Sequence, residues 1–266
     1  LGQNGAGKST LMRTIATLQD ADEGSIQFND IDVFAKPDAL RKILGYLPQE
    51  FGVYPNVTAE ELLAHVADMK GIVNKAERKE AVAALLEKVN LYPVRKKKLS
   101  TYSGGMKQRF GIAQALLGNP ELIIVDEPTA GLDPMERNRF YNLLAELGEN
   151  KVVILSTHIV EDVSTLCNDM AIIGHGEVLL TGKPDEVETA LNGRIWEIQI
   201  SREELAFYQE EYFVISSRFH LGKLIITVVS DNQPSGDFWL KSPTLEDAYF
   251  NLVRKNQAHP KTKSHA

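Results

Sequence analysis

Apolar residues recur at helical spacing in several parts of the chain, with polar residues on the opposite face. Within residues 7–19, the apolar positions that share one face are Leu11, Met12, Ile15 and Leu18. The same spacing predicts further helices at residues 58–70, 76–89, 103–117, 135–147, 159–167 and 244–253. Thr58 and Glu61 have the spacing of a capping box, which marks the start of the helix at residues 58–70.

Short, almost continuous apolar runs occupy residues 44–47, 122–125 and 152–155. Such runs are typical of parallel strands that are covered on both faces. A shorter strand is expected at residues 26–28, and a β-hairpin at residues 170–180. The alternation of strands and helices predicts an α/β fold with a parallel sheet and a helical insertion at about residues 51–118.

The pattern changes near Gly193, after which separate strands are expected at residues 195–200 and 224–229, before the last helix. We therefore expect a main domain over residues 1–192 and a small α+β appendage over residues 193–254. The polar, lysine-containing tail from residue 255 to residue 266 is expected to be disordered.

Composition narrows the class of protein. The 266 residues are 43% hydrophobic and 24% charged, as in ordinary globular proteins, and the single cysteine, Cys167, is typical of a reducing compartment. No apolar run approaches the roughly 20 residues of a membrane-spanning helix. The net charge of −7 argues against a nucleic-acid binder. The basic run at residues 95–98 fits a solvated turn, or a site that attracts anions or acidic lipid headgroups.

Residues 2–9 match the phosphate-binding pattern G-x-x-x-x-G-K-[ST] at every fixed position. Its glycines let backbone N–H groups point toward phosphate oxygens, and the following helix adds the positive end of its dipole. Lys8 is expected to reach the β- and γ-phosphates, and the Ser9 hydroxyl to bind Mg²⁺.

Two of the apolar strands end in residues that carry chemistry. Asp126 and Glu127 follow one strand, and His158 lies just beyond the next. The carboxyl ends of parallel strands are where open α/β sheets bind ligands. Asp126 is expected to hold Mg²⁺, and Glu127 to accept a proton from an attacking water. The alternatives are a helix cap or surface acid pair, and a histidine with a structural role.

A second anion site is expected where Ser103, Gly104 and Gly105 begin a helix, because the two glycines expose backbone N–H groups. Ser103 is a good N-cap and a free hydroxyl donor. The alternative is a tight turn that uses glycines without binding anything.

Taken together, these motifs resemble the nucleotide-binding cassettes of ATP-binding-cassette (ABC) transporters over residues 1–185. The resemblance identifies residues 2–9 as the Walker A loop, Gln49 as the Q-loop glutamine and Asp126 with Glu127 as the Walker B pair. It identifies residues 102–106 as the signature, Asp133 as the D-loop residue and His158 as the switch histidine.

The resemblance implies a P-loop ATPase fold and a Mg²⁺-dependent ATPase activity. It implies catalytic roles for Glu127, His158 and Gln49, and Mg²⁺ binding by Ser9, Gln49 and Asp126. The residues expected to bind nucleotide are Gly2, Asn4, Gly5, Ala6, Gly7, Lys8, Ser9 and Thr10. The signature residues Ser103, Gly104 and Gly105 are expected to contact ATP held by a second cassette.

Two features depart from the usual pattern. Family members have a strand with an adenine-stacking aromatic residue ahead of the loop, and Leu1 is the first residue here. We therefore expect a protein that starts at Leu1 to fold poorly and to bind ATP weakly. The signature reads Tyr-Ser-Gly-Gly-Met, which together with residues 242–250 resembles the branch serving ABC-2-type exporters.

The resemblance implies a cassette that pairs with a second cassette and powers export through a separate membrane permease. The helical insertion would dock on that permease, and the chain would lie on the cytoplasmic side of the cell membrane. One alternative is a soluble ABC ATPase that acts on ribosomes or DNA. Another is a degenerate cassette that only binds ATP, against which the presence of Glu127 and His158 argues.

Overall fold

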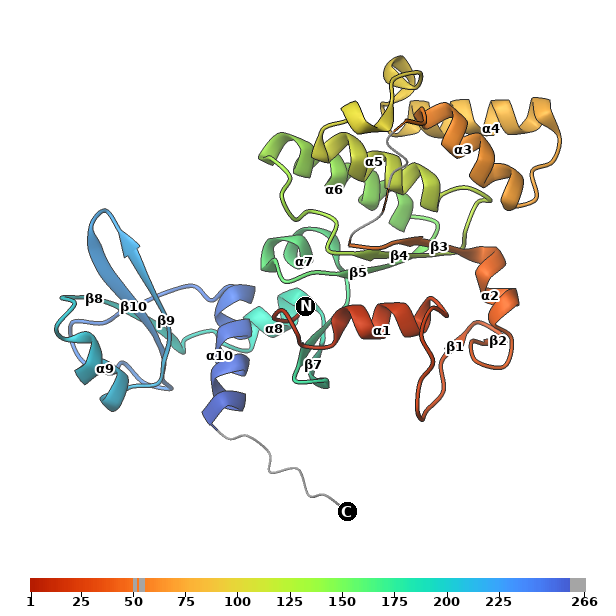
Figure 1. Cartoon of the computed structure of the whole chain (residues 1–266). Helices are drawn as coiled ribbons and strands as arrows, with labels where there is room; N and C mark the ends of the chain where they lie inside the picture. Colours follow the sequence, from red (N-terminus) through yellow and green to blue (C-terminus); the bar gives the residue numbers. More distant parts are fainter. Residues whose placement is uncertain (50–51, 53–55, 259–266) are drawn as a thin grey trace. The chain divides into compact units, whose positions relative to one another are not determined.

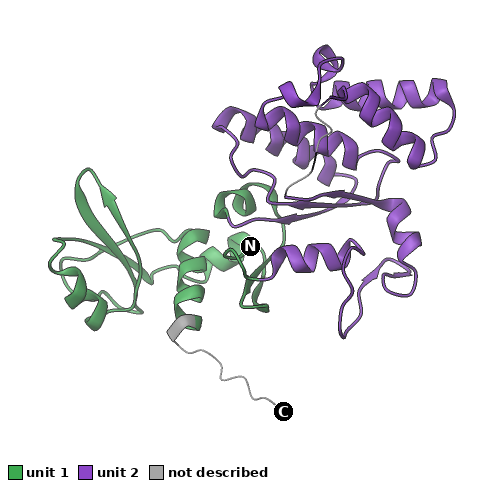
Figure 2. Cartoon of the chain, in the orientation of Figure 1, with its two compact units in different colours: residues 1–6, 159–266 green, residues 7–158 purple. Residues whose placement is uncertain are grey.

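The computed structural model describes residues 1–49, 52 and 56–258. The chain forms two units, which Figure 2 colours separately. One unit comprises Gly7–His158, and the other combines Leu1–Ala6 with Ile159–Ala266.

The first unit, Gly7–His158, is built on a parallel sheet with the strand order β3 (Leu44–Leu47), β4 (Leu122–Asp126) and β5 (Val152–Ser156). This confirms the α/β class and the parallel sheet. Every residue of β4 is buried, as expected of a strand covered on both faces. The same expectation is wrong for β5, where Val152 is 50% exposed, because within the described residues β5 has a strand neighbour on one side only.

Helices cover both faces of this sheet (Figure 1). Helix α1 (Lys8–Ile15) contacts β4 and β5, while α5 (Gly104–Ala115) contacts β3 and α6 (Pro134–Gly148) contacts β5. Helices α3 (Ala59–Met69) and α4 (Lys75–Lys88) pack on each other and on α5. The core beside α1 is formed by Met12, Ala16, Val33, Leu40, Leu44, Leu122 and Ile124.

The capping box at the start of α3 is confirmed, since Thr58 accepts from the Glu61 N–H and the Glu61 carboxylate accepts from the Thr58 N–H. The expected extension of α1 to residue 19 is wrong. Thr17 has a left-handed φ of 60°, which ends the helix. Leu11 and Leu18, expected on the apolar face, are 39% and 58% exposed.

Several short elements of this unit were not expected from the sequence or differ from the expectation. Strand β1 (Gln27–Phe28) pairs with β2 (Ile31–Asp32), and α2 (Pro37–Ile43) precedes β3. The basic run at residues 95–98 joins two short 3₁₀ turns, η1 (Tyr92–Val94) and η2 (Leu99–Thr101). Lys96, Lys97 and Lys98 are exposed there, which fits the interpretation as a solvated turn.

The second unit contains the expected hairpin, formed by β6 (Met170–Gly174) and β7 (Glu177–Gly182). Its turn residues His175 and Gly176 both have left-handed φ values, 51° and 81°. Helices α7 (Val160–Leu166) and α8 (Pro184–Thr189) flank the hairpin in sequence.

The same unit contains an antiparallel sheet with the order β11 (Trp239–Leu240), β8 (Ile195–Ile200), β10 (Lys223–Val229) and β9 (Val214–His220). Helix α9 (Leu205–Glu211) lies between β8 and β9 in sequence, and its Leu205 and Tyr208 pack on the sheet. The boundary that we expect at residue 193 stays a prediction.

The last helix, α10 (Leu245–Ala258), packs against α7, α8 and β9 (Figure 1). The expectation of disorder from residue 255 is wrong for residues 255–258, which are helical, and residues 259–266 lie outside the described residues. In the part of the chain that the structure describes, no helix combines the length and hydrophobicity needed to cross a bilayer.

Candidate nucleotide site

The loop at residues 2–9 has the backbone conformation that its glycines allow. Gly5 and Gly7 have left-handed φ values of 80° and 100°, and Gly7 is the N-cap of α1. A Cβ on Gly2 would lie 2.4 Å from the Ile173 carbonyl oxygen, so only glycine fits there. The loop is shared between the units: Gly2, Asn4, Gly5 and Ala6 belong to one, and Gly7, Lys8, Ser9 and Thr10 to the other.

Lys8 is the first residue of α1, and its side chain is buried despite its charge. Ser9 is half-buried and Thr10 is exposed. Because the first N–H groups of a helix have no partner within the helix, this terminus is suited to bind an anion.

The carboxylate pair lies at the carboxyl end of β4. In the parallel register Asp126 lies beside Ser156 of β5, and the Ser156 hydroxyl donates to Asp126 Oδ1 at 2.5 Å. Asp126 and Glu127 are only 3% and 4% exposed. A buried carboxylate is costly unless it is paired, so these two acids need partners close by.

Glu127 has those partners on two sides. Its Oε1 lies 3.2 Å from Lys8 Nζ, and its Oε2 lies 2.5 Å from His158 Nδ1. The backbone of Glu127 has a left-handed φ of 51°, and its N–H donates to the Ser156 carbonyl at 2.8 Å. A non-glycine residue in this conformation carries strain, which is more frequent at functional sites than elsewhere.

The structure thus brings together Lys8, Glu127 and His158, which are far apart in the sequence, beside the strand end that carries Asp126. The His158 side chain is 42% exposed, so this group of side chains faces solvent on one side. The sequence analysis did not single out Ser156, although the Ser-Thr-His run after the apolar strand was a signal for it.

Tyr46 is a further neighbour that sequence reasoning missed. Burial raises the pKa of its hydroxyl, the negative charge of Asp126 raises it further, and Arg13 acts in the opposite direction. The Asp126 carboxylate therefore influences the face of the sheet that α1 covers, where Tyr46 packs against the core.

The residues present fit a Mg²⁺ ion, which prefers oxygen ligands from one or two carboxylates together with substrate phosphates and waters. Asp126 and Ser9 supply such oxygens, on β4 and on α1, two elements that contact each other. The described residues contain no cluster of three or more His, Cys, Asp or Glu side chains arranged to hold a metal without such help. Gln49 is exposed, just ahead of residues outside the description.

The expected signature residues lie at the start of α5. Ser103 is its N-cap and accepts from the Met106 N–H at 3.2 Å, which fits the expected capping role. Gly104 is exposed, whereas Gly105 is buried. A Cβ on Gly105 would lie 2.7 Å from the carboxylate of Glu136, which pairs with Arg109 at 3.1 Å. Gly105 therefore also permits close packing of α5 on α6.

Asp133 is the N-cap of α6 and accepts from the Glu136 N–H at 2.9 Å. Ser103 and Asp133 thus have structural roles within their own helices, whatever else they bind. The Arg109 and Glu136 ion pair was not anticipated, because the two residues are 27 positions apart on different helices.

Comparison with known proteins places the chain in a family. A sequence model of the family described as "ABC transporter" matches residues 1–130. The chain is 37% identical over 195 residues to the probable multidrug ABC transporter ATP-binding protein YbhF of Escherichia coli, covering 73% of this chain and 33% of YbhF. The chain thus spans about a third of that relative's length.

It is also 30% identical over 236 residues to the daunorubicin/doxorubicin resistance ATP-binding protein DrrA of Streptomyces peucetius, covering 88% of this chain and 69% of DrrA. Among solved structures, a dimeric ATP-binding cassette in a post-hydrolysis state with ADP and Pi matches with a TM-score of 0.62 and 28% identity, covering 68% of this chain and 82% of that one. The chain therefore belongs to the ATP-binding proteins of the ABC transporter family, and its α/β core has the P-loop ATPase fold.

Proposed function

We propose that this chain is the subunit of an ABC exporter that binds and hydrolyses ATP. The observation that carries the proposal is the contact of Glu127, at the end of β4, with both His158 and Lys8, the lysine of the phosphate-binding pattern. Phosphoryl transfer to water depends on a lysine that holds the phosphates and on a residue that positions or deprotonates the attacking water, and Lys8 and Glu127 can supply these functions.

In this proposal the loop N–H groups and Lys8 bind the β- and γ-phosphates. Glu127 accepts a proton from water as the water oxygen bonds to the γ-phosphorus and the bond to the bridging oxygen breaks. His158, held against Glu127, orients the γ-phosphate and the water. Asp126, Ser9 and Gln49 would hold Mg²⁺, which supplies neutralisation of phosphate charge. Positioning and electrostatics then provide most of the rate gain.

A second cassette completes the site in the proposal. Ser103, Gly104 and Gly105 present N–H groups and a hydroxyl at the start of α5, and these would contact ATP bound by the loop of a second copy or a related cassette, with Asp133 near the same interface. The dimeric state named for the matching solved structure supports this arrangement. A two-fold interface of this kind is self-complementary.

The role in export rests on the relatives, since YbhF is named as a probable multidrug transporter component and DrrA as a resistance protein. We propose a separate membrane permease as partner, docked on the helical insertion and placing the chain at the cytoplasmic face of the membrane. Residues 51 and 53–55 of that insertion, and residue 50 just ahead of it, lie outside the described residues.

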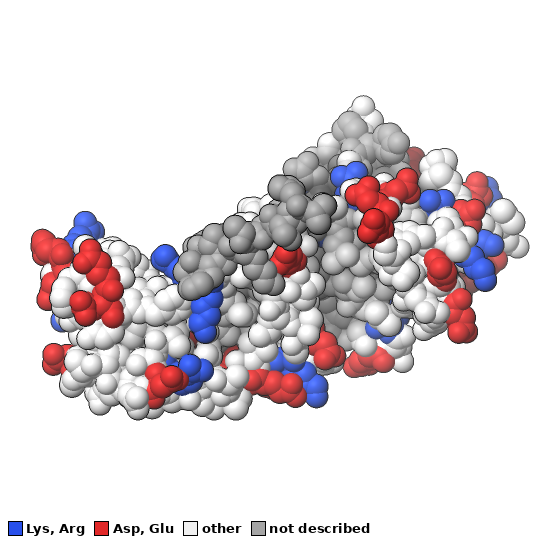
Figure 3. All heavy atoms as spheres, turned by 90° about the horizontal axis from the view of Figure 1, so that it is seen from below, with Lys and Arg blue, Asp and Glu red and all other residues white. Residues whose placement is uncertain are grey.

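The alternative of a cassette acting on ribosomes or DNA is less well supported. On the face shown in Figure 3, lysines and arginines are interspersed with acids instead of forming one basic surface. This mixed distribution and the net charge of −7 differ from the clustered basic surface that nucleic-acid-binding proteins use to contact phosphates.

The test is a complementation assay for ATP hydrolysis. A Lys8→Ala chain lacks the lysine of the loop, and a Ser103→Arg chain has a blocked signature, so each alone is expected to be nearly inactive. Mixing them forms dimers in which one composite site keeps both intact parts, and activity should recover to about a quarter of the wild-type value for random two-fold pairing.

No recovery on mixing, with each variant folded and dimeric, would contradict the composite site. Full activity of either variant alone would contradict the role of the residue changed. Recovery should require Mg²⁺, and hydrolysis that persists in excess chelator would contradict the metal assignment.

A further inference from the structure

The first half of the phosphate-binding loop is attached to the β6–β7 hairpin. The Ile173 N–H donates to the Leu1 carbonyl at 2.8 Å, and the Gly176 N–H donates to the Ala6 carbonyl at 3.0 Å. Gly2 approaches the Ile173 carbonyl so closely that no Cβ fits between them. The backbone of residues 1–6 is therefore held at both ends by the same hairpin.

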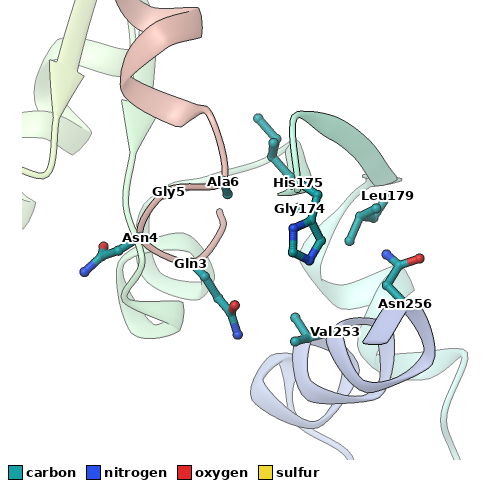
Figure 4. A pocket seen from close by; sticks show the side chains of 10 residues that line it. Gln3, Asn4, Gly5, Ala6, Gly174, His175, Leu179, Val253 and Asn256 are labelled. Atoms are coloured by element: carbon teal, nitrogen blue, oxygen red, sulfur yellow. The ribbon is translucent and has the colours of Figure 1, made fainter. Parts of the chain in front are cut away.

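Helix α10 forms a further wall beside this loop. A partly open cavity of about 60 Å³ is lined by residues 3–6, by the hairpin around His175, and by Val253 and Asn256 of α10 (Figure 4). In Figure 4 the His175 ring lies between the hairpin turn and α10, and the Val253 side chain points toward the loop. Pockets that hold small molecules measure roughly 300–1,000 Å³. This cavity is therefore too small to hold a nucleotide, and we interpret it as a gap in the packing of the loop, the hairpin and α10.

The other end of α10 is fixed to the antiparallel sheet. Asp247 accepts from the Thr244 N–H at 2.9 Å while the Thr244 hydroxyl accepts from the Asp247 N–H at 3.3 Å, which forms a capping box. Lys241 lies 2.7 Å from Asp247, and its own N–H donates to the carbonyl of Ile195 in β8 at 2.9 Å. These contacts give a structural reason for the distinctive segment at residues 242–250.

Apolar packing connects the two ends of α10. Leu245 and Tyr249 are buried in one cluster with Leu1, the residue just before the loop. Ala248 is buried in a second cluster with Ile195 of β8 and Ile215 of β9. Because closely packed interiors transmit displacement, a shift of the sheet reaches the loop through this helix.

We propose that Val253 and Asn256 are positioning residues of the phosphate-binding loop, through which α10 couples nucleotide binding to the antiparallel sheet. This inference rests on the proposed function. The loop N–H groups converge on phosphate only in one backbone conformation. Val253 of α10 packs against the cluster that contains Leu1, and Val253 and Asn256 line the space beside residues 3–6. Coupling free energies are reciprocal. If the conformation of the sheet changes the affinity for nucleotide, bound nucleotide must shift the conformation of the sheet by the same free energy.

The chain carries its own reporter for such coupling. Both of its 2 tryptophans lie in the antiparallel sheet, Trp196 in β8 and Trp239 in β11. The Trp196 Nε1–H donates to the Ser230 carbonyl at 3.1 Å, and Trp239 is 43% exposed. Tryptophan emission therefore monitors the sheet and not the nucleotide site, and we expect ATP to change it in the wild-type chain.

The experiment compares Val253→Ala and Asn256→Ala with Arg254→Ala, a control on the exposed side of the same helix turn. We expect the first two to raise the Kd and KM for ATP roughly 3- to 30-fold, the range that coupling residues without ligand contact produce, with kcat within about twofold. Both should weaken the tryptophan response. Arg254→Ala and the cavity-filling Val253→Ile should keep wild-type values.

Several outcomes would overturn the inference. These are an unchanged KM in both alanine variants, a loss confined to kcat, an equal effect of Arg254→Ala, or a wild-type chain that binds ATP without any change in tryptophan emission. A folded wild-type chain with no ATP binding at all, as opposed to the weak binding expected of a protein that starts at Leu1, would instead contradict the proposed function. Asn256→Ala, which removes a half-buried polar side chain, keeps the test valid if Val253→Ala fails to fold.

Discussion

Two regions of the chain contain the same kinds of interaction, namely buried carboxylates paired with hydroxyls and cations, together with a capped helix, but we propose different functions for them. At the end of β4, Asp126 accepts from a hydroxyl and Glu127 pairs with Lys8, and elsewhere in the same unit Ser103 caps α5. In the antiparallel sheet, Glu197 accepts from the Thr227 hydroxyl at 3.3 Å and from Arg218 at 3.0 Å. Beside this sheet, at the start of α10, Asp247 pairs with Lys241, and Thr244 caps the helix.

The difference lies in where the groups sit on their elements. Glu197 lies within β8 and Asp247 in the first turn of α10, and neither has a left-handed backbone. Glu127 follows the end of a parallel strand in a strained conformation, against a half-exposed histidine and the first residue of a helix. Burial of paired acids is thus a poor sign of catalysis on its own, and the strand end, strain and solvent access separate the two regions.

The largest effect is expected for Glu127→Gln. The amide keeps the size of the side chain but is a far weaker base, so turnover should fall by roughly 10²–10⁴, the usual contribution of a positioned general base, while ATP binding persists. Phosphate release at saturating ATP and nucleotide binding by titration measure the two quantities separately.

Its matched control is Glu197→Gln in the antiparallel sheet. This change weakens the contact with Arg218, which is half exposed, so the loss of unfolding free energy should be about 1–3 kcal/mol. Turnover per folded molecule should not change. Equal losses of turnover in both variants would show that the comparison between the two regions is wrong.

The next largest effect is expected on ATP affinity, from replacing the paired lysines of the two regions, Lys8 and Lys241. Lys8→Ala should lower ATP affinity by roughly 10- to 100-fold, as expected when a charged hydrogen-bonding partner is lost. Lys241→Ala should lower the urea midpoint and change ATP affinity far less than Lys8→Ala, by at most the few-fold effect of the proposed coupling through α10, because Asp247 keeps its bonds from Thr244. Unchanged nucleotide affinity in Lys8→Ala would refute its role in the loop.

The sequence predicted the parts of the structure that local pattern determines. The apolar runs at β3 and β4, the capping box at Thr58 and the hairpin at residues 170–180 all follow from neighbouring residues. Placing Glu127 and His158 at one sheet edge required only the rule that parallel strands end on the same side. The assignment to the ABC family followed from the order of the motifs.

The rest depended on contacts between distant residues or on unusual backbone conformations. No residue next to Glu127 in the sequence indicates its left-handed φ. Helix α1 likewise ends at a left-handed residue, Thr17, that the sequence pattern does not indicate. Helix α2 was missed because it is short and only its Leu40 is buried, which leaves no periodic pattern. Lys8 and Glu127 lie near opposite ends of the unit's sequence, so no local pattern indicates that their side chains are in contact.

The smallest effect separates the two helix caps. Ser103→Ala and Thr244→Ala each remove a side-chain acceptor from the first turn of a helix, so each should cost about 1 kcal/mol of unfolding free energy. If Ser103 also contacts ATP of a second cassette, its loss should lower turnover roughly tenfold as well, the value of one hydrogen bond to a charged group. Thr244→Ala should keep its turnover once the folded fraction is accounted for. Equal stability losses with equal turnover would make Ser103 a cap and nothing more, and would move the second anion site from the nucleotide chemistry to the packing of α5.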